Sequence, residues 1–124
     1  MISDGSGGYY VAGRTTGGTF EGGFVTHILS NGTQQASWGN RGSSQYYLPS
    51  GQTDFCLNGI VRQSSGNVVC AGLNTTGGTL KIYVMTSAGK DFSGYATNYV
   101  NSSIVPQFCA IDSNDKVVIV LFLD

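Results

Sequence analysis

The sequence predicts an all-β domain of antiparallel, blade-like repeats, about two and a half in number, arranged as a propeller-like array or as a β-sandwich. Short runs of β-branched and aromatic residues alternate with glycine-rich turns, which is the pattern of strands joined by tight connections. The order of turn, apolar strand and glycine-rich corner occurs at 8–19 and again at 66–79. No apolar stripe with a helical period is present, so no helix is expected.

The first unit is expected over residues 1–53 and opens with a turn and two strands. Residues 4–8 contain too much glycine for a strand and supply positions with positive φ. Residues 9–11 (Tyr-Tyr-Val) begin a strand because aromatic and β-branched side chains favour extended backbone. After a corner at 14–18, the next strand is expected at 23–29, with side chains alternating between its two faces.

The second half of the first unit reads as a hairpin. Asn31-Gly32 is the dipeptide that a type I′ turn prefers, because both central residues of that turn need positive φ. The return strand is then expected over 33–38 and ends in Trp38, and residues 39–51 are expected to form a polar connection.

The second unit, expected over 54–106, repeats this order of elements. Its residues 88–89 take the place of the Asn-Gly pair, and Tyr95 takes the place of Trp38 on the return strand. The third unit, expected over 107–124, is partial. The repeat length of roughly 50 to 60 residues is typical of propeller blades and solenoid units. The expected strands of these two units are 57–61, 68–72, 80–86, 108–112 and 117–123, and the expected turns are 64–67 and 113–115.

The last expected strand, 117–123, is apolar on both faces. An exposed strand of this kind would be a site of aggregation, so we expect it to be covered by its own sheet or by a neighbouring copy. We favour a homo-oligomer in which each subunit contributes roughly two blades, so that a trimer would have about six. A self-contained monomeric β-sandwich is the alternative.

Charge is scarce in this chain. Charged residues make up 10% of the sequence and the formal net charge is −1, whereas average globular domains have about 25% charged residues. This composition gives no electrostatic attraction to nucleic acid or to anionic membranes, so neither is an expected partner. Met1 is not followed by a basic segment and an apolar core, and no apolar run reaches the roughly 20 residues that span a bilayer.

The three cysteines, Cys56, Cys70 and Cys109, each lie in an apolar run. They lack the C-x-x-C spacing of a zinc site, so we interpret them as small buried apolar residues. A disulfide between Cys56 and Cys109 is the alternative, and the sequence alone does not place their Cα atoms.

No set of residues indicates catalysis, so we expect no enzyme, no cofactor and no metal. His27 has no Asp, Ser or Cys at motif spacing and is interpreted as a packed or hydrogen-bonded residue. The glycine-rich range 5–8 lacks the Lys-Ser/Thr pair of a phosphate loop. Asp112 and Asp115, with Asn114 between them, fit either a Ca²⁺ contact or a hairpin turn.

The candidate contact residues are aromatic: Tyr46, Tyr47, Trp38 and Tyr95. Aromatic faces among neutral hydrogen-bonding side chains suit carbohydrate, because a sugar offers both an apolar face and hydroxyl groups. Tyr and Trp are also favoured in protein interfaces. The range 43–50 is the best candidate contact loop, whereas a core position fits Trp38 and the tyrosines at 9 and 10 better, because they fall in strand positions that the repeat shares.

Three segments share the features of one repeat family. Residues 63–72 form a turn followed by an apolar strand, residues 110–118 form a strand followed by a turn, and residues 29–33 with Trp38-Gly39 form a closing half. These segments resemble the delta-sixty repeat, a β-propeller-like blade found in bacterial surface proteins and in phage tail and fibre proteins. The resemblance implies blade-like β-structure and carries no fixed enzymatic activity.

These observations together favour a non-enzymatic structural protein of a bacteriophage virion, in the tail fibre, the tail or a capsid-associated position. We expect it to be made in the host cytoplasm, to form a homo-oligomer and to bind other virion proteins. The alternative is a small oligomeric lectin with propeller-like blades that binds a host-surface glycan. An enzyme is a third hypothesis, for which the sequence offers no recognisable set of catalytic roles.

Overall fold

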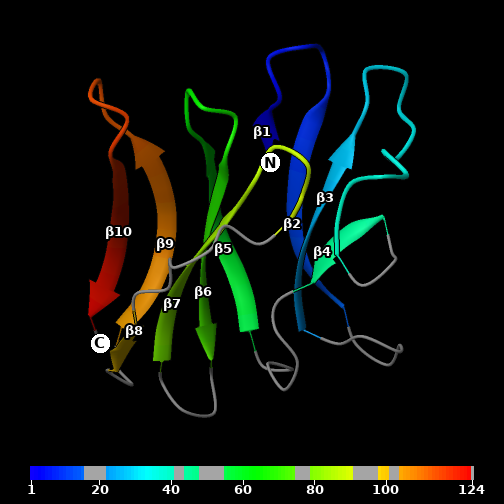
Figure 1. Ribbon diagram of the computed structural model, residues 1–124. Coiled ribbons are helices and arrows are strands. Elements are labelled where there is room, and N and C mark those ends of the chain that lie inside the picture. Colours follow the sequence, from blue (N-terminus) through cyan, green and yellow to red (C-terminus); the bar gives the residue numbers. More distant parts are fainter. Residues whose placement is uncertain are drawn as a thin grey trace.

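The computed structural model describes residues 1–15, 22–40, 44–47, 55–74, 79–90, 98–100 and 104–123. Within these ranges the chain forms three antiparallel sheets and no helix, which confirms the predicted all-β fold. The sheets lie side by side, with the second sheet between the other two (Figure 1).

Each sheet is a meander in which the strands follow one another in chain order. The first sheet contains β1 (Ile2–Ser3), β2 (Tyr9–Thr15), β3 (Gly22–Ile28) and β4 (Gln45–Tyr47). The second contains β5 (Phe55–Arg62), β6 (Val68–Asn74), β7 (Thr79–Met85) and β8 (Asn98–Val100). The third contains β9 (Ile104–Ile111) and β10 (Val117–Leu123), so it begins slightly before the range expected for the third unit.

The same five-residue turn recurs in all three sheets, at the upper end of the molecule in Figure 1. The N–H of its first residue donates to the carbonyl of its fifth residue, and its fourth residue has a positive φ. Four of these turns have the geometry of a three-residue hairpin loop, a type I turn followed by one left-handed residue, whereas the Asp4 turn also has a positive φ at Gly5. The first residues of these turns are Asp4, Leu29, Gln63, Thr86 and Asp112, and the fourth residues are Gly7, Gly32, Gly66, Gly89 and Asp115.

This turn corrects the expected type I′ geometry at Asn31-Gly32. Gly32 has a φ of 85°, but Asn31 is not among the described non-glycine residues with positive φ, of which Asp115 is the only one. The carbonyl of Leu29 accepts from the N–H of Gly32, and the Asn31 side chain accepts from the N–H of Thr33. The Asn-Gly signal therefore located the turn correctly and assigned the wrong type.

The return strand of the first sheet also differs from the expectation. Residues 33–38 contain only an isolated bridge between Gln34 and Ile28, and the strand that returns along β3 is β4, within the range expected to be a polar connection. The reason is that Trp38 and Gly39 donate hydrogen bonds to the turn that follows β7 in the second sheet, and not to β3. The chain thus leaves β3 after Gln35, contacts the second sheet at Trp38 and Gly39, and returns to β3 as β4.

Side chains of the second sheet alternate between two buried clusters, one against each neighbouring sheet. The first cluster joins the first and second sheets through Tyr10, Val25, Trp38, Ile60, Val68, Cys70, Tyr83 and Met85. The second cluster contains Val61, Val69 and Val84, against which Ile111 and Val117 of the third unit pack. Cys70 is fully buried, as expected, whereas the side chains of Cys56 and Cys109 lie outside the description.

Candidate functional site

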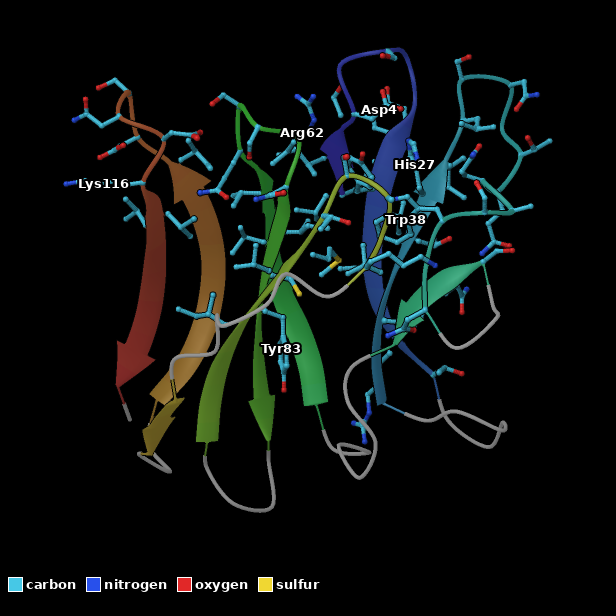
Figure 2. All side chains as sticks on the ribbon, in the orientation of Figure 1. Asp4, His27, Trp38, Arg62, Tyr83 and Lys116 are labelled. Atoms are coloured by element: carbon cyan, nitrogen blue, oxygen red, sulfur yellow. The ribbon has the colours of Figure 1, made fainter. Side chains whose placement is uncertain are left out.

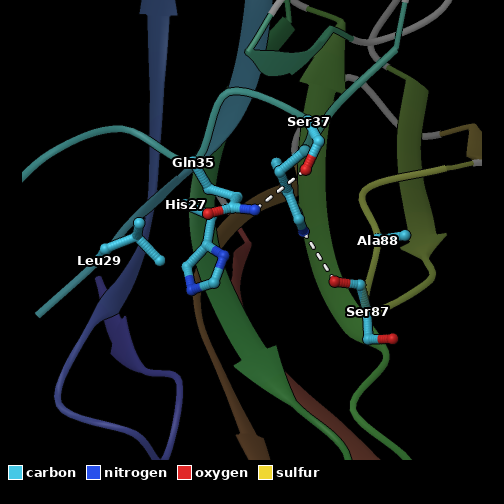
Figure 3. Close-up of a pocket in the computed structure, with 7 residues that line it drawn as sticks. His27, Leu29, Gln35, Ser37, Ser87 and Ala88 are labelled. Atoms are coloured by element: carbon cyan, nitrogen blue, oxygen red, sulfur yellow. Dashed lines mark hydrogen bonds between the residues drawn. The ribbon is translucent and has the colours of Figure 1, made fainter.

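A hollow of about 350 Å³ opens between the first sheet and the β7–β8 connection of the second sheet (Figure 3). Its polar groups are an imidazole, an amide and hydroxyls, and its apolar wall is an indole, a leucine and an alanine. The lining residues are His27, Leu29, Gln35, Ser37, Trp38, Ser87 and Ala88.

Trp38 forms the wall of the hollow and joins the two sheets. Its indole Nε1 donates to the carbonyl of Ser87 at 3.0 Å, and the N–H of Gly39 donates to the carbonyl of Ala88 at 3.3 Å. The Lys90 ammonium donates to the carbonyl of Gly39. Trp38 is only 2% exposed, so most of its surface is core and a small part faces the hollow.

Gly89 permits this contact. A Cβ atom at position 89 would lie 2.6 Å from the ring atom Cδ2 of Trp38 and 2.5 Å from the backbone nitrogen of Gly39. Gly89 also has a φ of 77°, which side chains other than glycine rarely adopt. The indole can therefore lie directly against the turn.

His27 is oriented by a carboxylate from the first turn. Its Nε2 lies 2.8 Å from Oδ2 of Asp4, and the two side chains are 14% and 8% exposed. Oδ1 of Asp4 accepts from the N–H groups of Ser6 and Gly8. The hydrogen bond to His27, supported by those backbone bonds, lowers the pKa of Asp4 and keeps it ionised.

Two aromatic rings fix the imidazole of His27 from the sides. Tyr10 stacks on it with ring centroids 4.5 Å apart and planes 27° from parallel, and Trp38 meets it edge-on at 6.1 Å. Figure 2 shows Asp4, His27 and Trp38 close together over β2 and β3, far from Lys116 on the opposite side. The register of the first sheet, which pairs Tyr10 with His27, produces this group.

Burial raises the pKa of two tyrosine hydroxyls near this junction. Desolvation raises the pKa of Tyr10, opposed by the positive charge of Arg62 and reinforced by the negative charge of Asp4. Desolvation, with a smaller contribution from Cys70, raises the pKa of Tyr83 on β7. Both tyrosines therefore stay neutral and act as core side chains.

A carboxylate-oriented histidine is the arrangement of a general base, but catalysis needs a reacting partner. Among the described side chains, Asp4 alone hydrogen-bonds to the His27 ring. The described residues also contain no group of three or more His, Cys, Asp and Glu side chains that could hold a metal ion. The Asp4–His27 pair ties the first turn to β3, in agreement with the interpretation of His27 as a hydrogen-bonded residue.

The structure describes the backbone of three of the four aromatic residues that the sequence suggested as contacts. Trp38 lies in the junction described above. Tyr46 and Tyr47 lie on β4, paired with Val25 and Phe24, so they belong to a strand and not to the expected loop. Nothing is described of their side chains, and Tyr95 lies outside the described residues.

The acidic residues of the last turn have backbone partners. Oδ1 of Asp112 accepts from the N–H groups of Asn114 and Lys116, which repeats the arrangement at Asp4. The carboxylate of Asp115 accepts from the N–H and the hydroxyl of Ser64 in the second sheet. These contacts agree with the hairpin interpretation and make Asp115 a link between sheets.

Sequence reasoning missed several residues of this site, among them Asp4, Gln35, Ser37 and Ser87. The position of Asp4 at the start of a glycine-rich turn was visible in the sequence, but its partner is set by the pairing of β2 with β3. Ser87 contributes a backbone carbonyl, which no side-chain motif can reveal.

No known family model, curated protein or solved structure matches this chain. Within the described residues, no helix has the length and apolar character needed to cross a bilayer.

Proposed function

We propose that this chain is a non-enzymatic structural component of a bacteriophage virion that assembles through its β-sheets, which act as blades of a propeller-like array. The neutral, glycine-rich composition and the resemblance to delta-sixty repeats support the virion setting. The way in which the sheets pack on one another supports the assembly.

Each sheet packs on the preceding one in the same manner. The first strand of the second sheet, β5, contacts β1, β2 and β3, and the first strand of the third sheet, β9, contacts β5, β6 and β7. The opening turns also contact the neighbouring unit: the Arg62 guanidinium, at the end of β5, lies near Gly5 of the first turn, and the carboxylate of Asp115 in the third turn accepts from Ser64 in the second. A repeated junction of this kind is how solenoid and propeller units bury surfaces that one unit cannot bury alone.

One observation carries the proposal. Residues at equivalent positions of the three units are buried where two sheets pack on each other and exposed on the two outer faces. Counting from the first residue of each opening turn, Tyr10, Val69 and Val118 are equivalent, and they are 4%, 1% and 46% exposed. Tyr9 and Val68 are likewise equivalent, and they are 45% and 0% exposed. Exposed apolar residues at positions that are otherwise core indicate faces on which another sheet can pack.

The virion proposal is tested on phage particles purified from a culture that expresses the gene. Mass spectrometry of particles banded in a density gradient should find the chain at a fixed ratio to the major capsid protein. Recovery of the chain only in the lysate, and not in the particles, would contradict the proposal.

The hollow at Trp38 favours one second function, a lectin that binds a host-surface glycan between sheets. Gln35, Ser37 and Ser87 supply neutral hydrogen-bonding groups beside part of an indole, a combination that suits a sugar. A glycan array tests this function, with Gln35→Ala as the variant that should lose the signal. A bound glycan that the variant binds equally well would place the site elsewhere.

A further inference from the structure

We infer that two copies of this chain stack head to tail, with the outer face of the third sheet of one copy on the outer face of the first sheet of the next. This inference rests on the proposed assembly and names its partner and its two surfaces. The leading face is the side of the third sheet that carries Ala110 and Val118. The trailing face is the side of the first sheet that carries Tyr9, Val11 and Ile28.

The internal junctions show which residues meet when one sheet packs on the next. Between the first and second sheets, Tyr10 and Val68 belong to one buried cluster. Between the second and third sheets, Val69 and Val117 pack in the other cluster. In both junctions, the earlier sheet contributes the residue equivalent to Val118, which is Tyr10 or Val69. The later sheet contributes the residue equivalent to Tyr9, which is Val68 or Val117. A third junction of the same kind would therefore join Val118 to Tyr9 of a second copy.

The sizes of these residues fit such a junction. The first internal junction combines a tyrosine with a valine, Tyr10 with Val68. The proposed junction combines a valine with a tyrosine, Val118 with Tyr9, so the total side-chain volume is the same. Because packing tolerates changes that conserve volume, the spacing of the sheets can be maintained.

The polarity of the two faces also fits burial. Tyr9 pairs with Ile28 and Val11 with Thr26 on the trailing face. The hydroxyl of Thr26 already accepts from Gln34 and donates to the carbonyl of Ser44, so it needs no water partner. On the leading face Val118 pairs with the small apolar Ala110. Neither set contains a charge that association would have to desolvate.

A second copy is the partner because the leading face requires a trailing face of the same sheet geometry, and this chain carries one. The two faces differ, so the contact is heterologous and joins copies in series into a ring or a filament. An isologous dimer would instead place Val118 against Val118 across a two-fold axis.

Two charge substitutions on exposed positions test this arrangement. Val118→Asp removes the leading face and Tyr9→Asp removes the trailing face, while each variant keeps the other face intact. Ser65→Asp, on the exposed turn of the second sheet, is the matched control. Circular dichroism establishes that each variant is folded, and light scattering after size-exclusion chromatography gives the mass.

The heterologous junction predicts that each of the two face variants alone is a monomer and that the control behaves as wild type. An equimolar mixture of the two variants should give a species of twice the monomer mass and nothing larger, since only one intact junction can form. A Tyr9→Asp variant that associates by itself would show a Val118–Val118 contact and overturn the inference.

Full association of both variants would also overturn it, by showing that assembly uses other surfaces. In that case the proposed assembly survives and only the head-to-tail junction fails. A wild-type chain that is monomeric at every concentration would contradict the proposed assembly itself.

Discussion

The carboxylate of Asp4 and the imidazole of His27 meet at 2.8 Å, from a turn and a strand that are 23 residues apart in the chain. The contact closes the first turn over β3 and places the imidazole between Tyr10 and Trp38. It therefore stabilises the surface on which the second sheet packs.

The Asp4–His27 contact predicts a loss of stability in acid. The folded protein lowers the pKa of Asp4 below its ordinary value of 3.8, so the contribution of Asp4 is fully present above that value. It is lost as the pH falls through the lowered pKa of the folded state. Urea unfolding of wild type and Asp4→Asn at pH 7 and pH 3 measures this, and wild type should lose more stability than the variant.

The matched control for Asp4→Asn is Asp112→Asn, because Asp112 accepts hydrogen bonds from the two equivalent backbone N–H groups of its own turn. Asp4→Asn should reduce the free energy of unfolding at pH 7 by about 1.5 to 3 kcal/mol, the range for hydrogen bonds to charged groups. Asp112→Asn should reduce the free energy of unfolding by less. Equal losses in the two variants would mean that His27 contributes nothing.

Gly89→Ala should destabilise the protein more than Gly32→Ala. Both glycines occupy the fourth position of the same turn with similar positive φ, but a Cβ at position 32 meets nothing within 4 Å. Gly32→Ala therefore measures only the cost of the left-handed backbone conformation, about 1 to 2 kcal/mol in the free energy of unfolding. A Cβ at position 89 also overlaps Trp38 and should add roughly 1 to 3 kcal/mol. Chemical denaturation gives both values, and equal losses would contradict the close contact with Trp38.

Trp38→Phe should retain a buried aromatic ring and lose the hydrogen bond to the carbonyl of Ser87. The unpaired carbonyl and the smaller ring should together cost about 1 to 3 kcal/mol. Thermal unfolding followed by circular dichroism measures the loss. An unchanged melting temperature would show that the indole N–H does not hold the two sheets together.

Asp115→Ala should cost more than Asp115→Gly. Both variants lose the contacts with Ser64, but glycine adopts the φ of 65° without strain. The difference should be about 1 kcal/mol in the free energy of unfolding. If alanine is tolerated as well as glycine, the left-handed conformation at this position is not retained in solution.

The sequence predicted the strands where the signal is local. The Tyr-Tyr-Val run of β2, the Val-Val run of β6 and the apolar β10 form strands because their own side chains favour extended backbone. Glycines also located four of the five turns, since a left-handed residue is needed in each, whereas the last turn uses Asp115 at that position.

What the sequence did not predict depends on contacts between distant segments. The position of β4 follows from the bond of Trp38 to Ser87, which draws residues 35–40 toward another sheet. The Asp4–His27 pair follows from the register of β2 on β3. Neither relationship leaves a spacing or a composition in the chain that could be read in advance.

Hydroxyl-radical footprinting of the wild-type protein at low and high concentration tests the proposed stacking most directly. Tyr9 and Tyr10 are adjacent in the chain, and stacking should change the exposure of Tyr9 alone. Tyr10 is 4% exposed and should stay protected at both concentrations, whereas Tyr9 is 45% exposed in a single copy. Tyr9 should be oxidised in dilute solution and protected when copies stack. Oxidation of Tyr9 that is equally strong at both concentrations, while light scattering shows association, would contradict the head-to-tail junction.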